Sequence, residues 1–317
     1  MESILSKKDL DLLEASLYYQ LKGLDIIELE IDTNQNIENE NIISQFISAK
    51  RIEGCSEKTL KYYKNTLVKL IETIKKNIKQ INTEDLRIYL SDYQKMNCPS
   101  NTTIDNIRRI LSSFFTWLEE ENYIVKSPVR RIHKVKCEKN VKEIINDEQI
   151  VFLKDACTNS RDLALIEILS STGIRVGELV GLNISDINFN ERSCIVLGKG
   201  NKQREVYFDG KTKIHLNEYL LSRKDSNPAL FVSIKEPNNR LTISGIEYIV
   251  KKIGLKCEMK DIHPHKFRRT LATYAIDKGM PIEQVQKLLG HVKIDTTLHY
   301  AMVNQNNVKI SHRKYLS

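Results

Sequence analysis

Residues 263–303, HPHKFRRTLATYAIDKGMPIEQVQKLLGHVKIDTTLHYAMV, carry the pattern that decides the fold of the C-terminal half of the chain. Apolar residues recur at helical spacing up to Gly279, which favours a first helix that ends on a left-handed residue. Pro281 suits the first turn of a second helix, whose apolar stripe stops at Gly290. Asp295 can cap a third helix by accepting hydrogen bonds from its free N–H groups.

Four side chains in this stretch can act on an anionic group: His265, Arg268, His291 and Tyr300. Taken singly, a histidine or tyrosine at such a position is more often structural than catalytic. Two upstream segments change that balance. STGIRVGELVGL at 171–182 places Arg175 at the start of a short helix, and LGKGNKQREVYF at 197–208 places Lys199 in a glycine-flanked hairpin turn. A lone lysine in a turn is also usually structural, so only the combination indicates chemistry.

The order H-x-x-R, L-G-H and T-T-x-x-Y, after the two upstream segments, resembles the tyrosine recombinases of the lambda-integrase and Xer class. The resemblance covers about residues 142–303, and five motif positions fall in the family's order. It implies a mainly α fold with a small antiparallel β-sheet, in which an N-terminal helical core-binding bundle precedes a mixed α/β catalytic domain. It also implies six catalytic residues: Arg175, Lys199, His265, Arg268, His291 and Tyr300.

Cutting a phosphodiester without losing its free energy requires a nucleophile that stays attached to the phosphate. A tyrosine hydroxyl can do this, because a DNA 5′-hydroxyl can later attack the phosphotyrosyl bond. The transition state gathers negative charge on the non-bridging oxygens, and planar, permanently charged guanidinium groups suit that charge. The resemblance gives the nucleophile's role to Tyr300 and places Arg175 and Arg268 on the phosphate.

The departing 5′-oxygen must receive a proton, and Lys199 can deliver one if neighbouring arginines lower its pKa. By the resemblance, Lys199 is the general acid, His265 assists proton movement at the tyrosine and His291 hydrogen-bonds the scissile phosphate. Neither a metal ion nor a nucleotide cofactor is expected, because the arginines supply the positive charge and the covalent bond preserves the free energy.

Two positions near the motif depart from the commoner family pattern, since Arg269 stands where a histidine is frequent and Phe267 where leucine is usual. The spacing from His265 favours Arg268 as the phosphate-binding residue, so neither departure touches an expected catalytic role. Glu178, three residues after Arg175, is expected to hold local structure by pairing with a neighbouring base.

Length and composition describe a globular protein with more than one domain. The 317 residues are 41% hydrophobic and 28% charged, values that exclude a disordered chain and favour two cores over one. No apolar run approaches a membrane span, and the N-terminus does not read as a signal peptide. The six cysteines lie far apart without a C-x-x-C pair, which indicates reduced thiols in a cytoplasmic protein and argues against zinc.

The net charge of +8 is distributed unevenly. Residues 1–40 hold ten acidic and three basic residues, whereas the other 277 hold 46 Lys and Arg against 31 Asp and Glu, a net charge of +15. A body this basic is expected to attract a polyanion, because each neutralised phosphate releases a counterion. Charge alone does not distinguish DNA from RNA, from an acidic protein or from a merely solvated surface.

The expected domain order follows from composition and from the resemblance. An acidic extension, 1–40, runs into a polar linker near 33–41 and precedes a helical core-binding, SAM-like DNA-binding domain, 41–124. A basic interdomain linker, 125–144, leads to the catalytic domain, 145–303. The tail, 304–317, is expected to dock on a neighbouring protomer.

Hydrophobic periodicity predicts first-domain helices at 41–51, 57–77, 83–95 and 102–121. In the second domain it predicts helices at 148–156, 161–171, 212–223 and 242–255, with strands at 193–197 and 204–208. Asp147 and Ser160 are expected to cap the first two of these helices. Basic residues expected to meet DNA phosphates are Lys58, Lys61, Lys64, Arg108, Arg109, Arg130, Arg131, Lys134 and Lys202.

The residues and the resemblance together favour a site-specific recombinase that acts through a 3′-phosphotyrosyl intermediate. The resemblance also implies a Holliday junction and a tetramer on two double-stranded DNA sites. A directionality factor or a DNA translocase can be an additional partner, and no membrane is expected to be one. Integration or excision of a mobile element and Xer-type resolution share this chemistry, and the composition tilts the choice slightly towards a mobile element.

Three alternatives use the same residues differently. A type IB topoisomerase-like nicking and closing enzyme would need no second site. The intact catalytic set argues against a catalytically idle DNA-binding regulator. A metal enzyme built on His263, His265, His291 and His299 lacks an accompanying acidic ligand.

Overall fold

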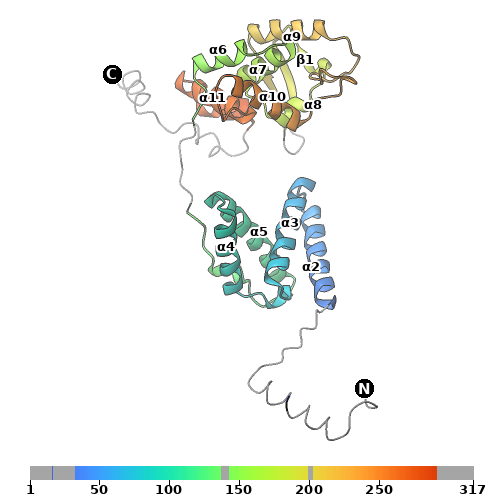
Figure 1. Cartoon of the computed structure of the whole chain (residues 1–317), viewed down its shortest axis with the longest axis vertical. Coiled ribbons are helices and arrows are strands. Elements are labelled where there is room, and N and C mark those ends of the chain that lie inside the picture. Colours follow the sequence, from blue (N-terminus) through green and yellow to red (C-terminus); the bar gives the residue numbers. More distant parts are fainter. Residues whose placement is uncertain (1–15, 17–32, 137–142, 199–202, 291–317) are drawn as a thin grey trace, which may run out of the picture. The chain divides into compact units, whose positions relative to one another are not determined.

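The structure, a computed structural model, describes residue 16 and residues 33–136, 143–198 and 203–290. The chain divides into two compact units, Met1–Lys139 and Asn140–Ser317, each with its own hydrophobic core (Figure 1). The mainly helical architecture with one small antiparallel sheet confirms the predicted fold class.

The described part of the first unit is a bundle of four α-helices. They are α2 (Thr33–Ile52), α3 (Glu57–Ile74), α4 (Thr83–Asn97) and α5 (Asn101–Glu120), with the 3-10 turn η1 (Ile78–Gln80) before α4. Aromatic rings fill the centre: the Phe46 ring lies edge-on to Phe114 at 5.1 Å and 5.5 Å from Trp117. Such ring pairs add a directional contribution to the burial of a large apolar area.

Helix α2 begins at Thr33, so the prediction of a polar linker over 33–41 is wrong. The side chain of Asn39, 1% exposed, donates to the carbonyl of Lys76 (3.2 Å) and accepts from the N–H of Ile78 (2.9 Å). These bonds to the α3–η1 connection satisfy a buried amide and fix the first part of α2 against the bundle. Tertiary contact thus makes a helix of a segment whose composition favours a loop.

The chain that follows α5 is attached to the first unit as far as Lys136. A 3-10 turn, η2 (Pro128–Arg131), comes first. The Val135 N–H then donates to Asp105 of α5 (3.2 Å), and the Asn101 side chain donates to the carbonyl of Lys136 (3.0 Å).

The chain is next attached at Ile145, in the second unit. Its N–H donates to the hydroxyl of Thr270 (2.9 Å) and its carbonyl accepts from the hydroxyl of Tyr274 (3.0 Å). Of the predicted linker, 125–144, only 137–144 lies between the two attachments, and 137–142 is outside the described residues.

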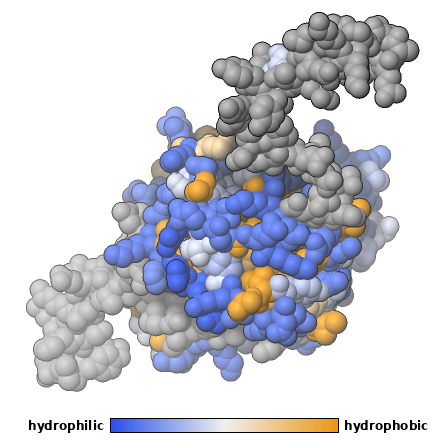
Figure 2. All heavy atoms as spheres, turned by 90° about the horizontal axis from the view of Figure 1, so that it is seen from below, coloured by the Kyte–Doolittle hydropathy of each residue, from blue (hydrophilic) through white to orange (hydrophobic). Residues whose placement is uncertain are grey.

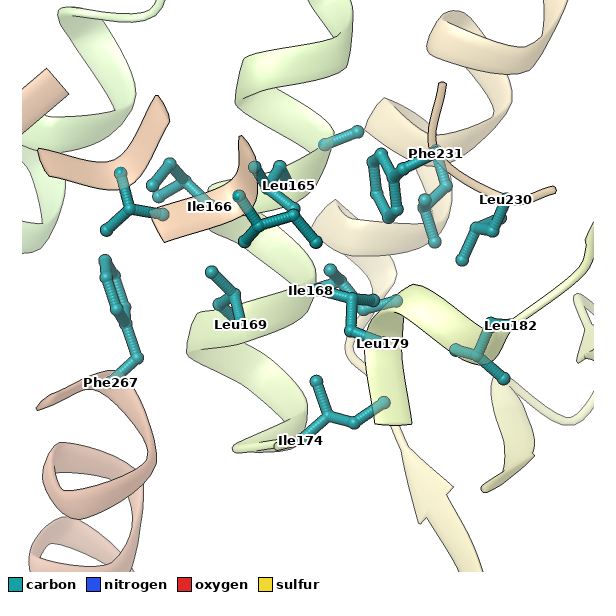
Figure 3. Close-up of a cluster of buried hydrophobic side chains, with 14 of the residues drawn as sticks. Leu165, Ile166, Ile168, Leu169, Ile174, Leu179, Leu182, Leu230, Phe231 and Phe267 are labelled. Carbon is teal, nitrogen blue, oxygen red and sulfur yellow. The ribbon is translucent and has the colours of Figure 1, made fainter. Parts of the chain in front are cut away.

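The described helices of the second unit are α6 (Asp147–Asp155), α7 (Ser160–Thr172), α8 (Val176–Gly181), α9 (Gly210–Ser222), α10 (Ile243–Lys256), α11 (Pro264–Asp277) and α12 (Ile282–Leu289). Helix α7 is central, because apolar side chains cover most of its circumference, and a helix of that kind must be surrounded by protein. Figure 3 shows Leu165, Ile166 and Leu169 of α7 among side chains of the neighbouring elements, with Phe267 of α11 on one side.

Two of the predicted caps are wrong by one residue. Asn146 and Asn159 accept the capping hydrogen bonds of α6 and α7, so Asp147 and Ser160 are the first helical residues. An asparagine one position earlier meets the same N–H groups and takes the cap position.

The sheet lies between α8 and α9 in the sequence. It contains β1 (Ile187–Asn188), β2 (Ser193–Leu197) and β3 (Gln203–Tyr207), in the order β1-β2-β3 with both pairs antiparallel. Leu197 pairs with Gln203, which confirms the predicted hairpin, with its second strand one residue earlier than predicted. Residues 199–202, between the two strands in sequence, are outside the described residues. The two-residue strand β1 was missed because it is too short for an alternating pattern.

The view in Figure 2 shows a mostly hydrophilic face on which hydrophobic residues form small, separate patches. No helix among the described residues is long and apolar enough to cross a bilayer.

Candidate active site and nucleic-acid interface

Arg175 is held where a buried helix ends and a short one begins. Gly173 closes α7 with φ of 58°, in the left-handed region where glycine carries no steric cost. Its position also needs the absence of a side chain, since a Cβ there would lie 2.8 Å from the Leu271 side chain and 3.5 Å from Cα of Arg268. The turn therefore packs directly on α11 and delivers Arg175 to the first position before α8.

Helix α11 presents His265 and Arg268 from its first two turns. His263 caps this helix, because its Nδ1 accepts from the N–H of Lys266 (3.0 Å), and Pro264 occupies the first helical position. Arg268 is 1% exposed, and its guanidinium donates to the carbonyls of Gly173 (2.8 Å) and Leu289.

One cavity of about 500 Å³ joins these residues. Its walls include three of the predicted catalytic side chains, Arg175, His265 and Arg268. Gly198, the residue before Lys199, lines the same cavity. Glu178 also lines the cavity, so two arginines and a histidine meet one acidic residue there. The excess of basic residues suits a phosphate group.

Three arginines from separate elements hold the C-terminal end of α12. Arg204 donates to the carbonyl of Leu288 (3.2 Å), and Arg268 donates to that of Leu289. Arg175 donates to the carbonyl of Gly290 (3.0 Å). The last carbonyls of a helix lack intrahelical partners and carry partial negative charge, so guanidinium groups stabilise them. This clamp fixes the point from which the chain continues to His291.

Glu178 connects two of the three arginines. Its carboxylate, 5% exposed, accepts from both Nη atoms of Arg204 (2.6 and 2.7 Å) and from Nη1 of Arg175 (2.8 Å). Its second oxygen also accepts from the backbone N–H of Arg175 (2.9 Å). Burial alone raises the pKa of Glu178, but the bonds from Arg204 and Arg175 outweigh it and hold the pKa below its ordinary 4.5. The predicted pairing of Glu178 with a neighbouring base is confirmed.

The remaining predicted residues of the site lie outside the described residues. They are Lys199, Lys202, His291 and Tyr300. The described chain stops next to two of them, at Gly198 on the cavity wall and at Gly290, whose carbonyl binds Arg175.

Arg204 was missed by sequence reasoning, although a signal for it exists. In β3 it stands two positions before the fully buried Val206, so strand alternation turns both side chains to the same face of the sheet. A charged residue on an inward face requires a partner of opposite charge, and Glu178 is that partner.

Most of the described basic residues predicted to meet DNA are exposed on the first unit, whereas the Arg108 side chain is only 15% exposed. Lys58, Lys61 and Lys64 are exposed along α3. Arg108 and Arg109 on α5 are both oriented by the buried carboxylate of Asp105, each through its Nε at 2.9 Å. The others are Arg130 and Arg131 in η2 and Lys134 after it.

Comparison with known proteins follows the same division of the chain. Residues 134–307 match the phage integrase family, and residues 42–124 match the N-terminal SAM-like domain of phage integrases. Tyrosine recombinase XerC of Oceanobacillus iheyensis is 31% identical over 289 residues, covering 86% of this chain and 94% of that protein.

Two solved structures share the fold. The XerH site-specific recombinase bound to palindromic difH substrate is 22% identical, with a TM-score of 0.69 and coverage of 95% of this chain and 94% of that one. A lambda integrase dimer bound to a COC′ core site is 16% identical, with a TM-score of 0.67 and coverage of 93% and 86%. One family model matches more than half of the chain, and a relative is 31% identical over 86% of it. The chain therefore belongs to the phage integrase family of tyrosine recombinases.

Proposed function

We propose that this site-specific recombinase cuts and rejoins DNA through a 3′-phosphotyrosyl bond to Tyr300. Site-specific recombination itself follows from membership of the family. The observation that carries the mechanism is the convergence of Arg175, His265 and Arg268 on one cavity.

In the cleavage step, the Tyr300 oxygen attacks the scissile phosphorus and its proton leaves with the help of His265. The bond from phosphorus to the 5′-oxygen breaks, and Lys199 gives that oxygen a proton. Arg175 and Arg268 bind the non-bridging oxygens, where charge accumulates, and His291 adds a hydrogen bond. A 5′-hydroxyl from the partner strand then reverses these steps and releases Tyr300.

Two contacts support a preorganised transition-state site. Arg268 is buried and fixed by two backbone carbonyls, so little side-chain entropy remains to be lost when phosphate binds. Arg175 has one Nη on Glu178 and the other on the Gly290 carbonyl, and its side chain is still 39% exposed on the cavity wall. Charges that are held before the reaction lower the barrier most effectively.

We further propose that the first unit binds duplex DNA through α3 and α5. Within the described part of the chain no ion pair involves Lys58, Lys61 or Lys64, so their charges are available to phosphates. Asp105 turns Arg108 and Arg109 into a fixed pair, and lysine and arginine contacts of this kind position a protein on DNA without reading its sequence.

The assembly that we propose is a tetramer on two DNA sites, working in the cytoplasm through a Holliday junction. The tail, 304–317, would dock on the neighbouring protomer, and a directionality factor or a DNA translocase would act as an additional partner. The XerC relatives favour Xer-type resolution over the role in a mobile element that composition suggested. Cleavage of duplexes from the flanks of the chain's own gene would instead favour the mobile element.

Leaving-group chemistry tests the assignment of Lys199 and Arg175. A duplex with sulfur in place of the scissile 5′-oxygen releases a thiolate, which needs no general acid. Lys199→Ala should lose about 100-fold or more in cleavage rate on the oxygen substrate and recover on the sulfur substrate. Arg175→Ala should be slow on both, because its role is on the non-bridging oxygens. A sulfur substrate that restores neither variant, or both, would contradict the assignment.

A further inference from the structure

Arg204 is a mostly buried charged residue bound to Glu178, which lines the cavity, and the proposed mechanism gives Arg204 no role. It reaches from β3 to two other elements at once, with both Nη atoms on the Glu178 carboxylate and Nε on the carbonyl of Leu288 at the end of α12. Its side chain is only 12% exposed, so these bonds form largely out of water. Three directed bonds are more than charge neutralisation of Glu178 requires.

We propose that Arg204 is a positioning residue for DNA cleavage: by occupying Glu178 it fixes the guanidinium of Arg175 at the cavity, and by binding Leu288 it holds that arrangement against α12. The inference rests on the proposed function, because it concerns the group that binds the transition-state phosphate. Arg204 itself does not line the cavity.

Competition between two anions explains the effect. Glu178 and the phosphate both accept hydrogen bonds from Arg175, and one Nη of Arg175 already binds Glu178 at 2.8 Å. Arg204 satisfies both oxygens of Glu178, which limits the pull of that carboxylate on Arg175. Without Arg204 the buried Glu178 would turn to Arg175 for compensation and draw its guanidinium away from the phosphate.

The requirement for arginine in particular follows from shape. The planar fork presents two parallel Nη–H groups to the carboxylate while Nε–H points elsewhere, and a lysine ammonium cannot reproduce that pattern. Gly290 makes room for the fork, since a Cβ there would lie 2.8 Å from Cδ and 3.1 Å from Nε of Arg204. Two features therefore require a glycine at the end of α12: the close approach of Arg204 and the left-handed φ of 63°.

The test compares Arg204→Met, Arg204→Lys, Glu178→Gln and the double variant Arg204→Met/Glu178→Gln on a duplex that wild type cleaves. Arg223→Met is the matched control, because Arg223 is also a buried arginine that binds an acid and several carbonyls in this unit. DNA affinity, the rate of adduct formation per folded molecule and the rate on the sulfur substrate are measured for each.

We expect Arg204→Met to keep DNA affinity within about threefold while adduct formation slows roughly 10- to 100-fold, the scale of a misplaced catalytic group. Arg204→Lys should be intermediate. The sulfur substrate should not restore the rate of Arg204→Met. The double variant should form the adduct no more slowly than Arg204→Met, because both changes act through Arg175. Arg223→Met should lower the melting temperature without slowing adduct formation by folded molecules.

A rate for Arg204→Met within threefold of wild type would overturn the inference, as would full repair by sulfur, which would place Arg204's effect on Lys199. Should Arg204→Met fail to fold, Arg204→Lys decides by the same readouts. If wild type forms no adduct on any duplex that it binds tightly, the proposed function and this inference are rejected together. Normal wild-type cleavage with an unaffected Arg204 variant rejects the inference alone.

Discussion

Gly173, at the end of α7, packs on α11 without a side chain between them, and Gly173→Ala should damage both stability and cleavage. Two effects add at this position. The residue has φ of 58°, and a new Cβ would lie 2.8 Å from the Leu271 side chain and 3.4 Å from that of Leu289. Gly279 is the matched control in the same unit, because its φ is 89° but a Cβ there meets nothing within 4 Å.

The control isolates the cost of the left-handed backbone. That cost is about 1–2 kcal/mol, offset in part by about 0.4–1 kcal/mol of lost freedom in the unfolded chain. Gly173→Ala adds overpacking against α11, which costs about 1–3 kcal/mol. We therefore expect Gly279→Ala to lose about 1 kcal/mol and Gly173→Ala about 3 kcal/mol. For a unit of this size these losses correspond to roughly 2–4 °C and 6–12 °C in Tm.

Calorimetry or circular dichroism of both variants measures the stability difference, and covalent adduct formation measures the effect on the site. The Gly173 carbonyl accepts a hydrogen bond from Arg268, so a displaced turn should also slow adduct formation by folded protein. Equal melting temperatures for the two variants would refute the packing argument. A destabilised Gly173→Ala that cleaves at the wild-type rate would refute the link from this turn to Arg268.

Three other perturbations follow from single contacts. Because the pKa of Glu178 is lowered in the folded protein, its ionised form stabilises the fold fully above an unfolded-state pKa of about 4.3. That stabilisation is lost as pH falls through the folded-state pKa. Glu178→Gln should therefore make the melting temperature in calorimetry less dependent on pH in the acid range. Lys61→Ala should weaken DNA binding similarly for all sequences and lower the slope of log affinity against log salt by about 0.9, measured by fluorescence anisotropy. Tyr274→Phe removes the hydroxyl bond to the Ile145 carbonyl and should cost about 1 kcal/mol in urea unfolding.

Each of these has a clear contrary result. An unchanged acid profile for Glu178→Gln would mean that the carboxylate is not held ionised by its arginines. An unchanged salt slope for Lys61→Ala would remove α3 from the DNA interface at that point. A neutral Tyr274→Phe would show that the attachment of Ile145 to α11 rests on Thr270 alone.

The resemblance to the tyrosine recombinases predicts Arg175, His265 and Arg268 as site residues, and local helix signals stand beside Arg175 and His265. Gly173 and Gly290 both take left-handed conformations at helix ends, as their positions after apolar stripes indicate. Arg175 comes two residues after Gly173, and His291 comes immediately after Gly290. Local rules therefore locate helix ends and starts, although they do not show which of these lie next to one another in the folded protein.

The missed start of α2 and the missed Arg204 are errors in which a distant contact decides the outcome. The start of α2 depends on the bonds of Asn39 to residues 76 and 78, which no window of the sequence around 33–41 contains. Arg204 is similar, since its partners lie 26 and 84 residues away. Strand alternation could have shown that Arg204 points inward, but the identity of its partner required the packing of β3 against α8 and α12.

Covalent trapping on DNA tests the central claim most directly. Wild type and Tyr300→Phe are incubated, with a chelator present, with nicked duplexes whose cleavage cannot reverse, and are resolved on a denaturing gel. Duplexes are taken from the flanks of the chain's own gene and from candidate chromosomal sites, and those that bind tightly and in a salt-sensitive way are scored. We predict a DNA adduct with wild type and none with Tyr300→Phe. Tight binding without an adduct, or an adduct that persists in Tyr300→Phe, would contradict the assignment of Tyr300 as the nucleophile.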